Sequence, residues 1–246
     1  MKKHIPNIIT CLNLFCGCMS IVSTFNGMLS AAAYFILLAA VFDFFDGFAA
    51  RWLKVSSEIG KQLDSLADMV SFGVAPASIM YWLLWNAGNK YNVQLPVEVE
   101  QFNYYGDLIA PAAFLIAVFS ALRLAKFNID SRQSDSFIGL PTPANAIFIC
   151  SLAFISLDYA LPFIDNIFFL LSVTVVFSFL LVANLPLFSL KFKSFGWKGN
   201  KIRYIFVVIS VLILLILHFA GLAVVILVYI ILSVVTNVNI FRQKSG

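Results

Sequence analysis

The sequence has 246 residues, of which 61% are hydrophobic and 11% are charged, and its formal net charge is +4. Ordinary soluble domains carry about 25% charged residues, so this composition excludes a soluble protein and indicates an all-α integral membrane protein. The basic residues form short clusters between apolar segments, which argues against a nucleic-acid-binding surface and indicates membrane topology instead.

Long uncharged segments define the predicted helices. Residues 5–42 and 204–241 are each too long for one crossing of a ~30 Å hydrocarbon layer, so each is expected to fold back once, at Asn26-Gly27 and near residues 218–221. No polar segment is long enough to form a soluble domain, so residues 1–246 are predicted to form a single membrane domain. We expect eight transmembrane helices, at about 7–26, 29–52, 58–86, 107–127, 144–160 and 164–188, with two more within 204–241.

The distribution of basic residues predicts how the chain is oriented. With both termini in the cytoplasm, every Lys and Arg except Lys90 lies on the cytoplasmic side, as the positive-inside rule requires. Lys2 and Lys3 lead into an apolar segment without a convincing small-residue cleavage site, so we expect the first helix to be retained. The predicted location is the inner (cytoplasmic) membrane of the cell.

Four aspartates, Asp43, Asp46, Asp64 and Asp68, lie in segments apolar enough for a bilayer. A charged side chain at bilayer depth costs at least ~2.5 kcal/mol, so four of them indicate a function. Their spacing puts each pair on one helix face, and a helical hairpin turning near residues 54–57 brings the two faces together. Clusters of oxygen ligands suit Mg²⁺, Mn²⁺ or Ca²⁺, and Mg²⁺ completes its coordination with phosphate and water. A metal-bound diphosphate is therefore the predicted ligand.

The pattern D-x-x-D-G-x-x-A-R, followed after eight residues by G-x-x-x-D-x-x-x-D, resembles the signature of the CDP-alcohol phosphotransferases. Its fixed positions here are Asp43, Asp46, Gly47, Ala50, Arg51, Gly60, Asp64 and Asp68. The resemblance implies a six-helix core over residues 5–188 with a catalytic hairpin at 43–68, two additional helices within 204–241, and a homodimer. It also implies that a CDP-linked donor gives up its phosphoryl-containing group to an alcohol, and that CMP leaves.

The resemblance assigns roles to the signature residues. One or two divalent ions, Mg²⁺ or Mn²⁺, would be held by Asp43, Asp46 and Asp64 with Asp68 near the second ion, and Asp68 would be the base that takes the proton of the alcohol. The remaining signature positions would contact CDP: Gly47, Ala50, Arg51 and Gly60. Three polar residues on one face of the first helix, Asn7, Thr10 and Asn13, are also expected in the nucleotide pocket, with helix–helix hydrogen bonding as the alternative.

Three further segments, PNIITCLNLFCG (6–17), RLAKFN (123–128) and FIGLPTPA (137–144), resemble the membrane-bound phosphatidylserine synthases of this family. This resemblance implies CDP-diacylglycerol as donor and L-serine as acceptor. The carboxylate of serine would need a cationic partner, for which Arg123, Lys126 and Arg132 are the candidates. The alternative for these three residues is that they serve membrane topology alone.

Two other functions fit the same residues. The first is another CDP-alcohol phosphotransferase, with glycerol phosphate or inositol phosphate as acceptor or with an archaeal ether-lipid donor. The second is a cation-coupled transporter, because acidic residues inside a membrane also mark ion pathways. Transporters often contain inverted repeats, whereas these four aspartates have no counterpart in a second half of the chain.

Overall fold

A computed structural model describes residues 4–55, 57–92, 104–129, 137–159, 161–187, 196 and 200–244. Nearly all of its regular structure is helical, and one antiparallel pair of two-residue strands joins Phe137–Ile138 to Pro186–Leu187. The α-helices are α1 (His4–Phe25), α2 (Leu29–Leu53), α3 (Glu58–Asp68), α4 (Ala75–Asn92), α5 (Tyr104–Ile109), α6 (Leu115–Ile129), α7 (Thr142–Asp158), α8 (Ile167–Val182), α9 (Lys201–Leu217) and α10 (Gly221–Lys244). Between them lie the π-helical turn η1 (Met69–Val74), the 3₁₀ helices η2 (Ala110–Phe114) and η4 (His218–Ala220), and the strands β1 (Phe137–Ile138) and β2 (Pro186–Leu187).

Five helical segments among the described residues are long and apolar enough to cross a bilayer: His4–Phe25, Leu29–Leu53, Glu58–Lys90, Gly106–Ile129 and Lys201–Thr236. The protein is therefore a multi-pass membrane protein, as its composition predicted. The helices α7 and α8 are apolar but shorter, with 17 and 16 residues. At 1.5 Å per residue they extend about 25 Å, less than the ~30 Å hydrocarbon layer. The expectation of eight full spans thus stays a prediction.

Most predicted helices are found with boundaries shifted by a few residues. The break expected near 218–221 is present as η4, and it separates α9 from α10. The helix predicted over 58–86 is confirmed as one continuous helical segment, Glu58–Lys90. It contains the π-helical turn η1, and α4 continues to Asn92. The helix predicted over 164–188 ends at Val182, since Pro186 and Leu187 form β2. This strand pair also makes the all-α prediction incomplete.

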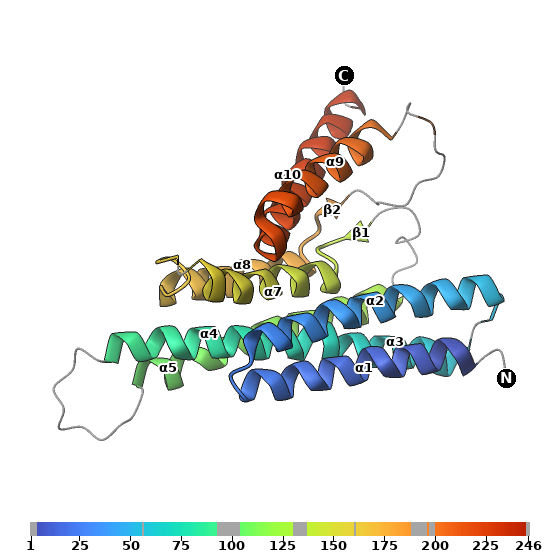
Figure 1. Ribbon diagram of the computed structural model, residues 1–246. Helices are drawn as coiled ribbons and strands as arrows, with labels where there is room; N and C mark the ends of the chain where they lie inside the picture. Colours follow the sequence, from blue (N-terminus) through green and yellow to red (C-terminus); the bar gives the residue numbers. More distant parts are fainter. Residues whose placement is uncertain are drawn as a thin grey trace.

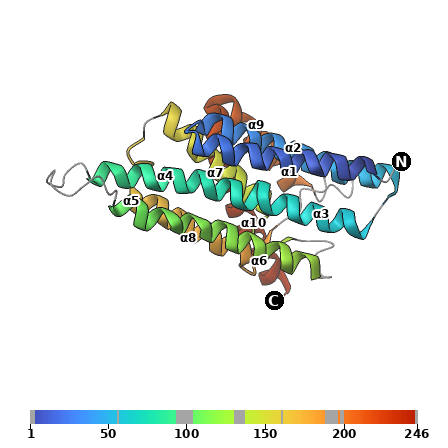
Figure 2. The same ribbon diagram turned by 90° about the horizontal axis from the view of Figure 1, so that it is seen from below.

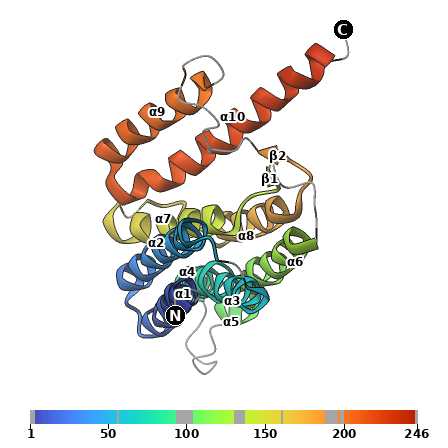
Figure 3. The same ribbon diagram turned by 90° about the vertical axis from the view of Figure 1, so that its right-hand side faces the viewer.

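The helices α1 to α8 form one bundle, and α9 and α10 form a hairpin inclined to it (Figure 1). Seen from below, α3 and α4 run between the α1–α2 pair and the pair formed by α6 and α8 (Figure 2). The C-terminal hairpin packs on the bundle through α10, which contacts α7 and β2 (Figure 3). The core of the bundle includes four side chains of α2 with no exposed surface: Ala32, Ala33, Ile36 and Ala39.

The connection between α2 and α3 is fixed by local backbone chemistry. Lys54 ends α2 in the left-handed conformation, and its N–H bonds to carbonyls of the last turn. Ser57 begins α3 as its N-cap and accepts a hydrogen bond from the Gly60 N–H at 3.0 Å. The predicted turn at 54–57 is therefore confirmed. The helix α1 packs against both α2 and α3, and it therefore sets the distance between the two arms of the hairpin.

Candidate active site

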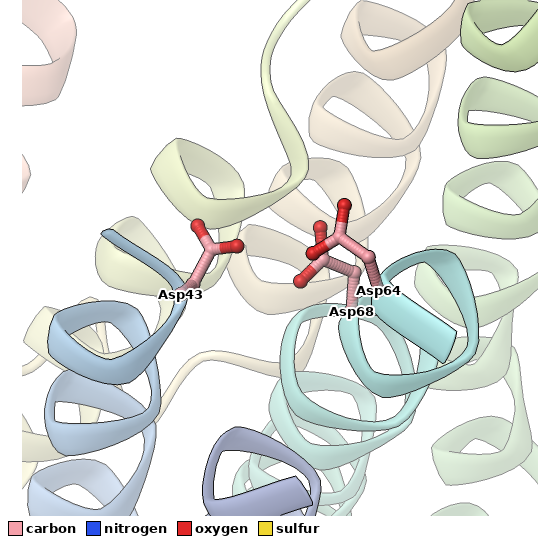
Figure 4. Close-up of side chains that lie close together, drawn as sticks. All are labelled: Asp43, Asp64 and Asp68. Atoms are coloured by element: carbon pink, nitrogen blue, oxygen red, sulfur yellow. The ribbon is translucent and has the colours of Figure 1, made fainter. Parts of the chain in front are cut away.

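Three carboxylates converge between the two arms of the hairpin. Asp43 comes from the middle of α2, and Asp64 and Asp68 come from successive turns of α3. One oxygen of each lies within 4.8 Å of the others (Figure 4). All three side chains are half-buried. The predicted meeting of the two acidic faces is therefore present in the fold.

The charge of this cluster is not compensated by any basic side chain that the structure describes. Among the described residues, no Lys or Arg forms an ion pair with Asp43, Asp64 or Asp68, whereas Lys90 and Asp165 do pair, at 2.7 Å, elsewhere in the chain. Asn13 reaches the cluster from α1, and its Nδ2 donates to Asp68 Oδ1 at 3.2 Å. Its own Oδ1 is fully buried and has no partner among the described residues. Three carboxylates and an adjacent unpaired amide oxygen are a donor set that fits a hard divalent cation.

The fourth aspartate of the signature, Asp46, stands apart from these three. It is 5% exposed, and it accepts a hydrogen bond of 2.7 Å from the Thr10 hydroxyl. That hydroxyl also donates to the carbonyl of Pro6. The contact links α1 to the acidic face of α2, and it holds the Asp46 carboxylate at the wall of the adjoining pocket.

A pocket of about 480 Å³ opens beside the acidic cluster. It lies among the first turns of α1, the last turns of α2 and the first turns of α3, and both Asp46 and Asp64 face it. Its lining residues are Pro6, Asn7, Thr10, Asp46, Gly47, Ala50, Val55, Ser57, Glu58, Gly60, Lys61 and Asp64. Five of the seven positions predicted to contact CDP are therefore around one cavity.

The other two predicted CDP positions lie elsewhere. Asn13 is one turn further along α1, where it contacts Asp68 rather than the pocket. Arg51 is exposed at the end of α2, and its guanidinium passes over Gly47, where a Cβ would lie 3.4 Å from one terminal nitrogen. Whether these residues contact the nucleotide stays a prediction.

Close packing requires a glycine at position 60, in addition to its location in the pocket lining. A Cβ at this position would lie 2.9 Å from both Asn7 Oδ1 and Ser57 Oγ, so a side chain would displace the start of α1 or the cap of α3. The absence of a side chain lets the starts of α1 and α3 pack closely at the rim of the pocket.

Two charged residues of the pocket were not predicted from sequence. The pocket lining includes Lys61 and Glu58. A usable signal was present, because Lys61 precedes Asp64 by three residues and thus shares its helix face. The charge of Lys61 would complement a diphosphate.

The three candidate cations for the acceptor have different environments. Arg123 is 5% exposed in α6, its Nε donates to the carbonyl of Leu140 at 2.9 Å, and its guanidinium lies over the Phe127 ring at 5.3 Å. Lys126 is exposed in the last turn of α6. Arg132 lies outside the described residues. Arg123 is thus the candidate that burial and position favour.

Comparison with known sequences decides the family. The sequence profile of the CDP-alcohol phosphatidyltransferases matches residues 3–182, from the start of the chain to the last residue of α8. The chain belongs to the CDP-alcohol phosphatidyltransferase family. Members of the family are enzymes, which argues against the transporter interpretation. The acidic signature lies wholly within the matched segment.

Several curated proteins are similar to this phosphatidyltransferase. A CDP-diacylglycerol--serine O-phosphatidyltransferase of Bacillus subtilis is 35% identical over 152 residues, which cover 62% of this chain and 76% of the relative. One of the same name from Helicobacter pylori is 35% identical over 58% of this chain and 54% of the relative. An archaetidylserine synthase of Methanothermobacter thermautotrophicus is 35% identical over 60% of this chain and 56% of the relative. The chain thus spans little more than half the length of the second and third relatives.

Proposed function

We propose that this protein transfers a phosphatidyl group from CDP-diacylglycerol to the hydroxyl of L-serine, which yields phosphatidylserine and CMP. The observation that carries the proposal is the cluster of Asp43, Asp64 and Asp68 beside a cavity whose lining includes the signature residues Asp46, Gly47, Ala50 and Gly60. The names of the relatives support the choice of serine. Because one of these relatives is named an archaetidylserine synthase, an ether-lipid donor is the second candidate.

The donor would bind with its nucleotide in the pocket and its lipid chains in the bilayer. The small residues Gly47 and Ala50 leave room for cytidine close to α2, while Lys61 and Arg51 offer positive charge to the diphosphate. Asp43 lies eight residues below Arg51, or about 12 Å along the helix, so the reacting phosphate would sit below the membrane surface. We propose that this end of the bundle faces the cytoplasm.

We assign the aspartates to divalent metal, two Mg²⁺ or Mn²⁺ ions in our proposal, with Asp43, Asp46, Asp64 and Asp68 as the protein ligands. The bound ions would supply neutralisation of the diphosphate and polarisation of the reacting phosphorus. The chain contributes the geometry: Thr10 orients Asp46 through a hydrogen bond of 2.7 Å, and Asn13 orients Asp68 through one of 3.2 Å. Positioning of this kind accounts for a large part of the rate enhancement of such transfers.

The transfer itself is proposed as one direct displacement. The serine oxygen forms a bond to the phosphorus of the phosphatidyl group, and the bond from that phosphorus to the CMP oxygen breaks with its electron pair on CMP. Asp68 takes the proton from the serine hydroxyl. Arg123 would hold the serine carboxylate, with Lys126 and Arg132 as further candidates at the cytoplasmic side. We also propose that the protein works as a homodimer in the inner membrane.

The test is CMP release by the detergent-purified protein with CDP-diacylglycerol and Mn²⁺ or Mg²⁺. Serine, glycerol 3-phosphate and inositol are each supplied as the acceptor, and an ether-lipid analogue replaces the donor in a parallel series. We expect release with serine, together with a phosphatidylserine product. Release with a different alcohol alone would contradict the acceptor assignment and leave the metal site standing. Absence of release with every acceptor from folded protein would contradict the proposed reaction.

A further inference from the structure

A buried amide in α7 has no partner, and neither the signature nor the proposed chemistry uses it. Asn145 has no exposed surface, yet neither Oδ1 nor Nδ2 makes a hydrogen bond within the described part of the chain. Burying an amide without compensation is unfavourable, and native proteins satisfy the great majority of such groups. A side chain with both a free donor and free acceptor inside the bundle therefore indicates a bound polar molecule.

The register between two helices gives the height of this amide relative to the acidic cluster. The helices α2 and α7 pack together and run in opposite directions (Figure 1). The rings of Tyr34 and Phe154 meet at 5.1 Å and fix their relative position. Nine residues further along α2 is Asp43, and nine residues back along α7 is Asn145. Because both helices rise 1.5 Å per residue, Asn145 lies near the height of Asp43. Nine residues are two and a half turns, so each of these residues stands on the face of its helix opposite the aromatic pair.

A second contact and the close-up agree with this register. The helix α7 also packs against η1, the turn that follows Asp68 directly. Figure 4 shows the first turns of α7, in pale yellow-green, beside Asp43. The helix that carries Asn145 thus packs against both α2 and the turn after Asp68, whereas the described lining of the nucleotide pocket includes no residue of α7.

The start of α7 also concentrates positive potential. Pro141 is its N-cap and provides no side-chain hydrogen bond, so the N–H groups of Thr142 and Ala144 are not capped by a side chain of that residue. The carbonyl of Leu140, one residue earlier, accepts the hydrogen bond from Arg123. A permanent cation therefore reaches the residues just before α7, the helix that carries Asn145. Thr142 adds a hydroxyl in this turn, and it is 3% exposed.

These groups suit a hydroxy amino acid such as serine better than an alcohol without charged groups. A carboxylate is stabilised by a guanidinium and by a helix N-terminus. An ammonium group needs an acceptor, which Asn145 Oδ1 offers without the full negative charge that would compete for metal. We propose that Asn145 is a specificity-determining residue of the acceptor site and that it hydrogen-bonds the amino-acid part of the acceptor. This inference rests on the proposed function, and it adds the residue that distinguishes serine from alcohols lacking the ammonium group.

The test compares four full-length proteins in detergent with CDP-diacylglycerol and Mn²⁺: wild type, Asn145→Leu, Asn145→Ala and Ser151→Ala. Asn145→Leu keeps the approximate size and removes the polar atoms. Ser151→Ala is the matched control, because Ser151 is equally buried in α7 but bonded to the carbonyl of Phe148 at 2.6 Å. The readouts are KM for serine, KM for the donor, Mn²⁺-dependent binding of CDP, and kcat/KM for serine relative to 3-hydroxypropionate, which lacks the ammonium group.

We expect both Asn145 variants to raise the serine KM at least tenfold and to lower the preference for serine over 3-hydroxypropionate by a similar factor. A site built to hydrogen-bond a polar group discriminates strongly against ligands without it. The donor KM and CDP binding should stay within twofold, and Ser151→Ala should resemble wild type. A serine KM unchanged in Asn145→Leu would overturn the inference, and so would parallel losses of serine use and CDP binding. If the wild type itself releases no CMP with serine, the proposed function fails and this inference with it. If the wild type is active and only the Asn145 result is negative, the proposed function stands.

Discussion

The crossing of α1 over η1 offers the sharpest test of how the fold positions the base. At Gly17 a Cβ would lie 2.5 Å from Ser71 Oγ and 2.8 Å from Ser71 Cα. Contact with a backbone atom cannot be relieved by rotating a side chain. One turn away, Ser71 Oγ donates to the carbonyl of Asn13 at 2.9 Å, and Asn13 donates to Asp68. We therefore predict that Gly17→Ala damages activity through this chain of contacts.

The size of the effect follows from the distances. Restoring a contact of about 3.4 Å from the 2.8 Å position requires the two backbones to separate by about 0.6 Å. The same separation would stretch the 3.2 Å bond between Asn13 and Asp68 to about 3.8 Å, beyond hydrogen-bond distance. Loss of a hydrogen bond to a charged group costs about 1.5–3 kcal/mol. If this hydrogen bond stabilises the transition state by that amount, its loss decreases kcat roughly ten- to a hundredfold. Overpacking itself should destabilise the fold by about 1–3 kcal/mol.

The assay is CMP release at saturating serine and donor, with thermal unfolding measured on the same preparations. Gly196→Ala is the matched control, because a Cβ there meets nothing within 4 Å. The double variant Gly17→Ala with Ser71→Gly removes the clash with the hydroxyl but keeps the clash with Cα, so it should stay impaired. Wild-type kcat and thermal stability in Gly17→Ala would refute the argument that this crossing positions Asp68.

The remaining predictions concern the charged residues. Asp43→Ala should reduce the Mn²⁺-dependent affinity for CDP, measured by calorimetry, by roughly tenfold or more. The control Asp165→Ala removes only the exposed ion pair with Lys90 and should leave this affinity unchanged. Equal effects of the two substitutions would contradict the metal assignment. Asp68→Asn should lower turnover by about 10²–10⁴-fold and keep CDP binding nearly intact, and activity within a few-fold of wild type would remove Asp68 as the base. Arg123→Lys keeps the charge but loses the Nε contact to Leu140, so the serine KM should rise more than the donor KM; equal increases would give Arg123 a structural role.

Local patterns in the sequence were enough for the membrane class, the acidic signature and the hairpin turn. The spacing of Asp64 and Asp68 places both on one helix face, and Ser57 caps α3 by accepting a hydrogen bond from Gly60, three residues away. The break before Gly221 was likewise predicted, because an uncharged segment of that length exceeds one bilayer crossing.

Contacts between distant segments were decided only by the tertiary structure. The partners of Thr10 and Asn13 could not be assigned from the face they share, since one bonds Asp46 and the other Asp68. The π-helical turn after Asp68 has no pattern that separates it from an ordinary apolar helix, and the pairing of β1 with β2 joins segments about fifty residues apart. The height of Asn145 relative to Asp43 depends on the packing of α7 against α2. Helix periodicity fixes which side chains share a face, but only packing between helices fixes which faces meet and at what height.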